Sequence, residues 1–195
     1  MKTKTKKKTA KKTKKKATKK VAKKVAKKVV KKAASKKKLA KKVKVKPIPE
    51  GAQTITAYLI VKNASAAIDF YKKAFGAKEK YRIEAPKGTV GHAELKIGDS
   101  NIMLAEEFPN MQAKGPKAYG GSPVTLHLYC KDVDAQGAKA LAAGCKALHP
   151  VENQFYGERA GKFEDPFGHI WFLSSRIEKV SLKEMQKRAL AMMAK

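Results

Sequence analysis

The stretch EDPFGHIWFL, residues 164–173, joins a turn to the strand that follows it. Asp165, Pro166 and Gly168 suit positions i, i+1 and i+3 of a type I turn, because proline presets the backbone angle that position i+1 requires. The apolar residues after the turn indicate a strand that packs in a core. We therefore expect a hairpin here, with Trp171 facing the core.

The second half of the chain reads as one strand, one helix and three further strands around this hairpin. The predicted strands are VTLHLYC (124–130), KALHPVEN (146–153), GERAGKFED (157–165) and HIWFLSS (169–175), and the predicted helix is DVDAQGAKALAAGC (132–145). Gly144 ends that helix, as glycine commonly does at a helix C-terminus.

The first half of the folded region repeats this order. Its predicted elements are the strand TITAYLIV (54–61), the helix NASAAIDFYKKAFGA (63–77) and the strands KEKYRIEA (78–85), VGHAELKIG (90–98) and SNIMLAEE (100–107). A shift of 68 to 69 residues places Lys62 on Lys131 and Gly76 on Gly144. Self-similarity at a fixed spacing indicates two copies of one structural unit.

The sequence therefore predicts an α+β fold with two tandem βαβββ units. We expect a disordered lysine-rich tail at 1–46, a domain at 47–178 with units at about 54–107 and 122–175, and a C-terminal amphipathic helix within 179–195. Ser181 is the predicted cap of that last helix, with Glu184 at the capping-box position.

Two motifs carry a resemblance to a known family. The helix with Ala-Ile-Asp-Phe-Tyr at 67–71 and Phe-Gly-Ala at 75–77, together with the EDPFGHIWFL ending, resembles the vicinal-oxygen-chelate superfamily of glyoxalases, bleomycin-resistance proteins and extradiol dioxygenases. The resemblance covers roughly residues 47–175. It implies curved mixed sheets that form a half-barrel, helices on the outside, a ligand cavity within, and a homodimer.

The resemblance also implies four positions at which metal-dependent members hold a divalent cation with His and Glu. These positions fall on Thr56, Met103, Thr125 and Phe172. Side chains of these types do not together hold such an ion. We therefore expect no metal and no other cofactor, with a displaced metal site formed by the set His92, Glu94 and His127 as the alternative.

The predicted ligand cavity combines apolar and polar side chains on the inward faces of the strands. Its expected lining is Thr56, Tyr58, His92, Glu94, Met103, Thr125, His127, Phe163 and Phe172. Such a mixture fits a small organic ligand. His92, Glu94 and His127 are candidates for acid–base catalysis. The alternatives are a wet groove for His92 and Glu94, a hydrogen bond across the sheet for His127, and a structural role in the turn for His169.

The tail carries most of the net charge of +30 and holds 25 lysines without any acidic residue or arginine. Its composition is similar to that of linker-histone tails, and its lysines are expected to displace counterions from nucleic-acid phosphates without reading sequence. The lysines assigned to this contact are Lys11, Lys12, Lys14, Lys15, Lys16, Lys19, Lys20, Lys23, Lys24, Lys27, Lys28, Lys31 and Lys32. A solubilising tail, an anionic membrane and polyphosphate are the alternatives.

The remaining features bound the location and the function. No stretch of 18 uninterrupted apolar residues occurs, and Cys130 and Cys145 fit reduced thiols in a cytoplasmic, nucleoid-associated protein. Arg159 either binds an anionic ligand or lies solvated at the surface.

Three hypotheses remain: a small-molecule-binding protein tethered to nucleic acid, a lyase or other enzyme acting on a small metabolite, and a DNA-compacting protein whose domain serves as a dimeriser.

Overall fold

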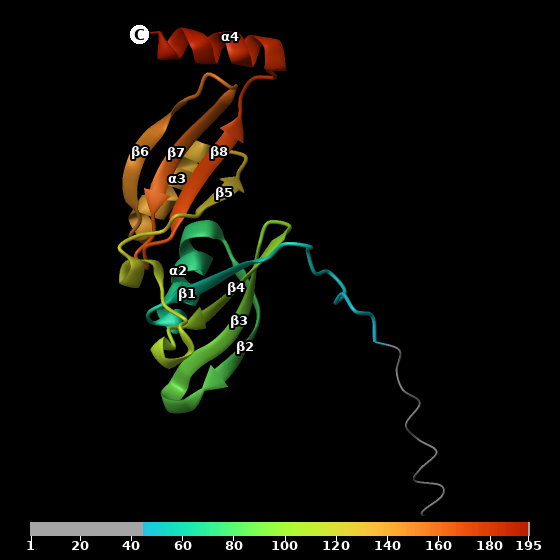
Figure 1. The fold of residues 1–195 in the computed structure, drawn as a ribbon, viewed down its shortest axis with the longest axis vertical. Coiled ribbons are helices and arrows are strands. Elements are labelled where there is room, and N and C mark those ends of the chain that lie inside the picture. The colour runs from blue at the N-terminus through green and yellow to red at the C-terminus, as the bar shows by residue number, and fades with distance from the viewer. Residues whose placement is uncertain (1–44, 195) are drawn as a thin grey trace, which may run out of the picture. The chain divides into compact units, whose positions relative to one another are not determined.

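The structure, a computed structural model, describes residues 45–194 (Figure 1). The chain divides after Pro49, and the unit from Glu50 onward contains every helix and strand of the described part. The thirteen lysines assigned to nucleic acid lie outside the described residues. The predicted disorder of the tail also falls outside them.

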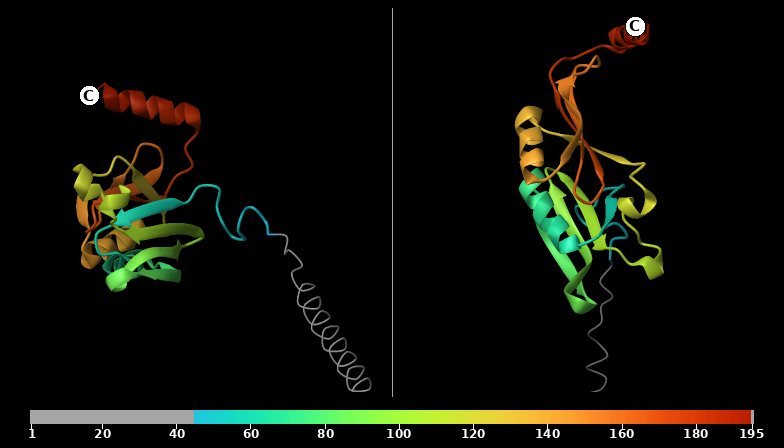
Figure 2. Two further views of the ribbon diagram at one scale, coloured as in Figure 1. Left: turned by 60° about the horizontal axis from the view of Figure 1, so that its bottom comes forward. Right: turned by 90° about the vertical axis from the view of Figure 1, so that its left-hand side faces the viewer.

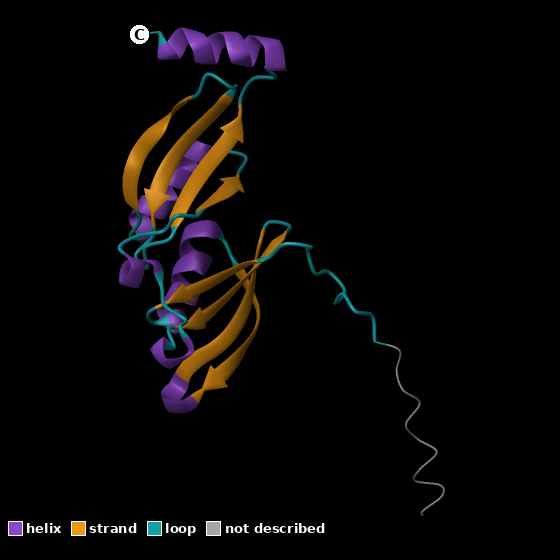
Figure 3. Ribbon diagram, viewed as in Figure 1, coloured by secondary structure: helices purple, strands orange, loops and turns teal. Residues whose placement is uncertain are grey.

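The second unit contains two βαβββ modules and a last helix, which Figure 3 shows by element type. The first module consists of β1 (Ala57–Val61), α2 (Ala64–Phe75), β2 (Lys78–Ala85), β3 (Thr89–Ile97) and β4 (Ser100–Glu106). The second consists of β5 (Thr125–Tyr129), α3 (Val133–Ala143), β6 (Lys146–Asn153), β7 (Glu158–Glu164) and β8 (Ile170–Arg176), and α4 (Leu182–Met193) follows. The short 3-10 turns Pro86–Gly88, Pro109–Met111 and Pro116–Tyr119 lie in connections.

Each module forms its own four-stranded mixed sheet. The strand order is β1-β4-β3-β2 in the first sheet and β5-β8-β7-β6 in the second. In both sheets the first strand pairs in parallel with the last strand of its module, and the other pairs are antiparallel. Both sheets are open. The predicted α+β fold of two tandem βαβββ units is therefore confirmed.

The two module helices begin and end where their sequences predict. The side chain of Asn63 accepts a hydrogen bond from Ala66 N at 3.2 Å, and Asp132 caps α3 in the same way. Gly76 and Gly144 follow the helices in the left-handed conformation. Within α3, a Cβ on Gly137 would lie 3.1 Å from the ring of Phe163, so this glycine lets the helix approach its sheet closely.

The two modules are joined by packing between their helices and aromatic side chains. In the right-hand view of Figure 2, α2 and α3 lie on the same side of the sheets, and the two helices contact each other. The ring of Phe75 on α2 lies 4.4 Å from that of Trp171 on β8, between ring centroids. Trp171 is buried, as predicted.

Asp165 is the polar centre of this junction. The residue is only 3% exposed, and its Oδ2 accepts hydrogen bonds from the Tyr71 hydroxyl at 2.8 Å and from Trp171 Nε1 at 2.9 Å. Its Oδ1 accepts from the backbone N–H groups of Phe167 and His169, both at 2.9 Å. Burial, followed by the charge of Asp165, raises the pKa of Tyr71 well above its usual value, so this hydroxyl stays a donor.

The turn itself has the predicted geometry and role. Gly168 N donates to the Asp165 carbonyl at 3.0 Å, which is the hydrogen bond that closes a type I turn. His169 is buried, and its Nε2 lies 3.3 Å from the Ile60 carbonyl of the first module. Burial lowers the pKa of His169, which favours a neutral ring with a structural role.

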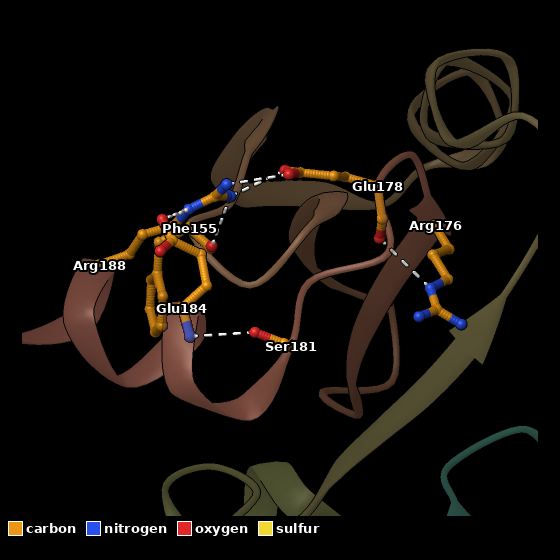
Figure 4. Close-up of polar contacts among 6 residues, drawn as sticks. All are labelled: Phe155, Arg176, Glu178, Ser181, Glu184 and Arg188. Atoms are coloured by element: carbon orange, nitrogen blue, oxygen red, sulfur yellow. Dashed lines mark hydrogen bonds and ion pairs between the residues drawn. The ribbon is translucent and has the colours of Figure 1, made fainter.

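The helix α4 is attached mainly through Arg188 (Figure 4). The guanidinium donates to both carboxylate oxygens of Glu178, at 2.8 and 2.9 Å, and to Glu184 at 3.0 Å. Ser181 caps the helix by accepting from Glu184 N at 3.3 Å. The capping position is thus as predicted, but the Glu184 carboxylate pairs with Arg188. No residue of α4 is buried.

Replacing Tyr71 by Phe tests the importance of the Asp165 centre. The variant loses a hydrogen bond to a buried carboxylate, so we expect the free energy of unfolding to fall by about 1.5–3 kcal/mol. Tyr119→Phe is the matched control, because Tyr119 is 66% exposed and should lose almost nothing. Urea unfolding followed by circular dichroism measures both, and equal stabilities of the two variants would contradict the assignment.

Candidate functional site

The open face of the first sheet carries a row of four cross-strand partners. Tyr58 on β1 lies opposite Met103 on β4, Met103 opposite Glu94 on β3, and Glu94 opposite Tyr81 on β2. Cross-strand partners share a face of the sheet, and residues two apart on one strand do so as well. His92 therefore lies on the same face as this row, in the next row, opposite Ile83. The other face of the sheet packs against α2 through buried Leu59, Ala93, Leu95 and Leu104.

Hydrogen bonds connect the polar members of this face. The Tyr58 hydroxyl lies 3.0 Å from His92 Nδ1, and the Tyr81 hydroxyl lies 3.5 Å from His92 Nε2. Tyr81 also donates to Glu94 Oε1 at 2.8 Å, and Lys80 donates to Glu94 Oε2 at 2.7 Å. A continuous polar chain, the Tyr58–Lys80 network, thus runs across the sheet. Tyr81 and Lys80 were not among the residues predicted from the sequence.

The network fixes the charge state of its members. The hydrogen bonds from Lys80 and then Tyr81 lower the pKa of Glu94, so the carboxylate is ionised at neutral pH. The bond to Glu94 raises the pKa of Tyr81, and burial raises that of Tyr58. Both phenols therefore keep their protons, and the face offers hydroxyl groups and an imidazole to a ligand.

The second sheet carries an equivalent row with different chemistry. His127 on β5 lies opposite Phe172 on β8, Phe172 opposite Lys162 on β7, and Lys162 opposite His149 on β6. Thr125 lies on the same face, opposite Ile170. Lys162 and His149 were not among the predicted site residues, since the sequence gives no register for β6 and β7.

His127 is held by several neighbours on this face. Its Nε2 lies 2.7 Å from Ser174 Oγ across the sheet, which is the hydrogen bond that the sequence offered as an alternative to catalysis. Tyr129 stacks on the imidazole with ring centroids 4.4 Å apart, and Phe172 lies 5.1 Å away on the same measure. Glu158 Oε2 lies 3.9 Å from Nε2, and it is buried without a hydrogen-bond partner in the described residues.

One residue of the predicted cavity lies on the wrong face. Phe163 pairs with Trp171 in the sheet register, is only 2% exposed and contacts α3 near Gly137. The expectation that Phe163 faces a cavity is therefore wrong. Thr56 lies just before β1 and is half-buried. The other predicted lining residues lie on the open faces of the two sheets, where their binding of a ligand stays a prediction.

The four positions that the resemblance assigns to a metal do not fit one. Met103 and Phe172 stand in the middle of their rows, and neither a thioether nor a phenyl ring replaces a carboxylate or an imidazole. Thr56 and Thr125 add only hydroxyl groups. The displaced set of His92, Glu94 and His127 is not assembled either, because residues 45–194 contain no group of three side chains able to hold a metal ion.

Two further candidates from the sequence have structural partners. Arg159 donates to both carboxylate oxygens of Asp134 on α3 at 2.7 Å, so its guanidinium already has an anionic partner within the chain. Cys130 and Cys145 are free thiols, as expected. Burial raises the pKa of Cys145 to about 12, which makes this thiol unreactive.

A hollow of about 520 Å³ lies away from both open faces, at the start of α2. Lys62, Asn63, Lys117 and Phe167 are among its lining residues. The acidic residue that lines it, Glu107, is already used, since its Oε1 accepts a hydrogen bond from Gly115 N at 2.7 Å. We assign this hollow to the junction of the modules.

Comparison with known proteins agrees with the fold. Residues 52–173 match the Glyoxalase/Bleomycin resistance protein/Dioxygenase superfamily, and the chain belongs to that family. An uncharacterized protein of Mycobacterium tuberculosis is 41% identical over 135 residues, which are 68% of this chain and 79% of that protein. A Mycobacterium bovis relative has the same identity, with 89% of its length covered.

A solved structure of a gene product from Arabidopsis thaliana is similar in fold. It has a TM-score of 0.53 and 29% sequence identity, and the match covers 63% of this chain and 98% of that one.

In residues 45–194, no helix is long and apolar enough to cross a membrane.

Substitution of Lys80 by Gln tests the Tyr58–Lys80 network. Removing the cation removes the strongest cause of the lowered pKa of Glu94, so we expect this pKa to rise towards its ordinary value. Tyr81→Phe should raise it less. Because the pKa is lowered in the folded state, the stability that Glu94 adds is present at neutral pH and is lost as the pH falls through that pKa. Carbon NMR titration of the carboxyl group measures the shift.

Lys73→Gln on α2 is the control for this titration, since Lys73 forms no ion pair among the described residues. A Glu94 pKa that is unchanged in Lys80→Gln would show that the network does not exist in solution.

Proposed function

We propose that this protein is a metal-independent, small-molecule-binding member of the superfamily, which its lysine-rich tail tethers to nucleic acid. The observation that carries the proposal is the Tyr58–Lys80 network. It occupies the open face on which the family's metal-dependent members place their ligands, while Met103 stands at a metal position itself. Aromatic walls with a few connected polar groups fit an organic ligand.

The open faces also support a homodimer. Large side chains on them are exposed to solvent, including Tyr58 at 48%, Tyr81 at 44%, Ile83 at 57% and Tyr129 at 65%. Exposed apolar surface of this extent commonly marks an interface or a ligand site. We propose that a second copy of the chain covers part of these faces and encloses the ligand.

The tail supplies the second half of the proposed function. Its 25 lysines would release counterions from a polyanion, which gives affinity without sequence preference. Arginine, the residue best suited to bidentate guanine contacts, is absent from residues 1–46. A cytoplasmic, nucleoid-associated location follows from this partner.

A second candidate function is an enzyme that uses the same network. The Tyr58 hydroxyl lies 3.0 Å from His92 Nδ1, which is within the reach that proton transfer requires. Under this alternative, His92→Gln abolishes turnover of a metabolite that still binds. Under the binding function, the same variant changes affinity only.

Metal addition tests the metal-independent part of the proposal. We expect Ni²⁺, Zn²⁺, Mn²⁺ and Fe²⁺, each added at tenfold excess to the full chain, to leave the melting temperature unchanged, because residues 45–194 contain no suitable donor set. The same titrations with a chelator serve as the control. Stoichiometric bound metal together with a raised melting temperature would contradict the proposal.

Salt-dependent DNA binding tests the tether. If about ten lysines engage phosphates, the slope of log K against log salt concentration is about −9 for duplex DNA. Fluorescence anisotropy with two labelled duplexes of unrelated sequence should give equal affinities. Replacing all 25 lysines of residues 1–46 by Gln should abolish binding, while replacing them by Arg should preserve it.

The competing partners are outcomes of the same experiment. If the chain binds polyphosphate or anionic vesicles more tightly than DNA at equal charge, that polyanion is the partner of the tail instead of nucleic acid. DNA binding that survives the Gln substitutions would place the contact in the folded unit.

A further inference from the structure

The two modules place opposite charges at equivalent positions of their open faces. Glu94 and Met103 are cross-strand partners in the first sheet, and Lys162 and Phe172 are the corresponding partners in the second. Met103 and Phe172 are 69 residues apart, which is the spacing of the sequence repeat. The duplicated unit has therefore kept the row and changed its charge from an acid to a base.

The charge of the first row is already neutralised, whereas that of the second is not. Glu94 accepts from Lys80 at 2.7 Å and from Tyr81 at 2.8 Å. In contrast, no hydrogen bond or ion pair joins Lys162 to any residue that the structure describes. Lys162 is a half-buried residue whose cross-strand partner is Phe172, and a cation in such a place favours an anion from outside the chain.

The neighbours of Lys162 suit the two ends of an organic acid. Two imidazoles, His127 and His149, lie on the same face in the same row and can donate hydrogen bonds to a carboxylate or phosphate. Phe172 lies between His127 and Lys162 and offers an aromatic surface to the apolar part of a ligand. The His127 side chain is 39% exposed, so a ligand can reach it.

The acidic residues of this region leave the row accessible to an anion. Glu164 lies in the adjacent row, opposite Lys146 on β6. Glu158 accepts a hydrogen bond from the Tyr129 hydroxyl at 3.1 Å, and its other oxygen is buried 3.9 Å from His127 Nε2. Neither carboxylate stands in the row of Lys162, and Glu152 on β6 lies in an adjacent row, opposite Ala160.

We propose that the open face of the second sheet binds a small organic anion, with Lys162 and His149 at the charged group, Phe172 under the apolar part and His127 at the far end of the row. The proposal rests on the proposed function, since it names the class of molecule that one of the two open faces takes. It gives the first face a different ligand chemistry, because hydroxyl groups and a neutralised carboxylate line that face.

Histidine NMR can test this in the full chain. All 4 histidines lie in the folded unit and none in the tail, so their Cε1–H signals do not respond to anions that bind to the tail. His127 and His149 report on the second face, His92 reports on the first, and buried His169 serves as an internal reference. Benzoate is the probe, and benzyl alcohol is its neutral counterpart.

We expect benzoate to shift the signals of His127 and His149 in a saturable way while those of His92 and His169 stay unchanged. Lys162→Gln should weaken the affinity for benzoate at least about tenfold, the usual effect of losing one charge-assisted contact. Lys162→Arg should retain binding and keeps the test valid if the Gln variant does not fold. Lys139→Gln on the exposed side of α3 removes the same charge and should change nothing.

Three results would overturn the inference. Equal shifts with benzyl alcohol would leave a binding face intact but show that it does not select anions. Equal losses in Lys162→Gln and Lys139→Gln would show a general charge effect. A benzoate titration that shifts no histidine signal would show that the anion site does not exist. If benzyl alcohol also left the His92 signal unshifted, the result would count against the proposed function as well.

Discussion

The buried carboxylate of Asp165 is the constraint on which the rest of the molecule depends. An ionised group in a core is stable only if hydrogen bonds replace the water it has lost. Four donors from three separate parts of the chain do so: the turn after β7, Trp171 on β8 and Tyr71 on α2. The last hydrogen bond spans 94 residues and joins the modules, so their relative arrangement follows from satisfying one charge.

Much of this fold could be predicted from the sequence because its signals are local. Caps such as Asn63 and the turn glycine Gly168 lie within a few residues of the elements they bound. The role of Asp165 could not be predicted, because turn chemistry explains the residue without reference to Tyr71. Phe163 was misplaced because β7 is a central strand with buried residues on both faces, including Ala160, so alternation does not identify its outer side.

The site was predicted less completely for a related reason. Its residues on β1, β3 and β4 follow a regular alternation, whereas β2 and β6 contain register shifts. A shift beside Tyr81 decides that this side chain faces Glu94, and another beside His149 decides its partnership with Lys162. Bulges re-aim side chains at the edges of sheets, and residue patterns do not locate them. The chemistry that distinguishes the two faces therefore lies in the part of the sequence that periodicity describes least well.

The attachment of α4 has a consequence for how the molecule opens. This helix has no buried residue, and the guanidinium of Arg188 links it to Glu178 and to the Phe155 carbonyl in the turn before β7. Exposed ion pairs are weak and are screened by salt. The C-terminal helix is thus a local unfolding unit whose opening free energy lies far below that of the sheets and decreases as ionic strength rises. Proteases would reach this segment while both modules are still folded.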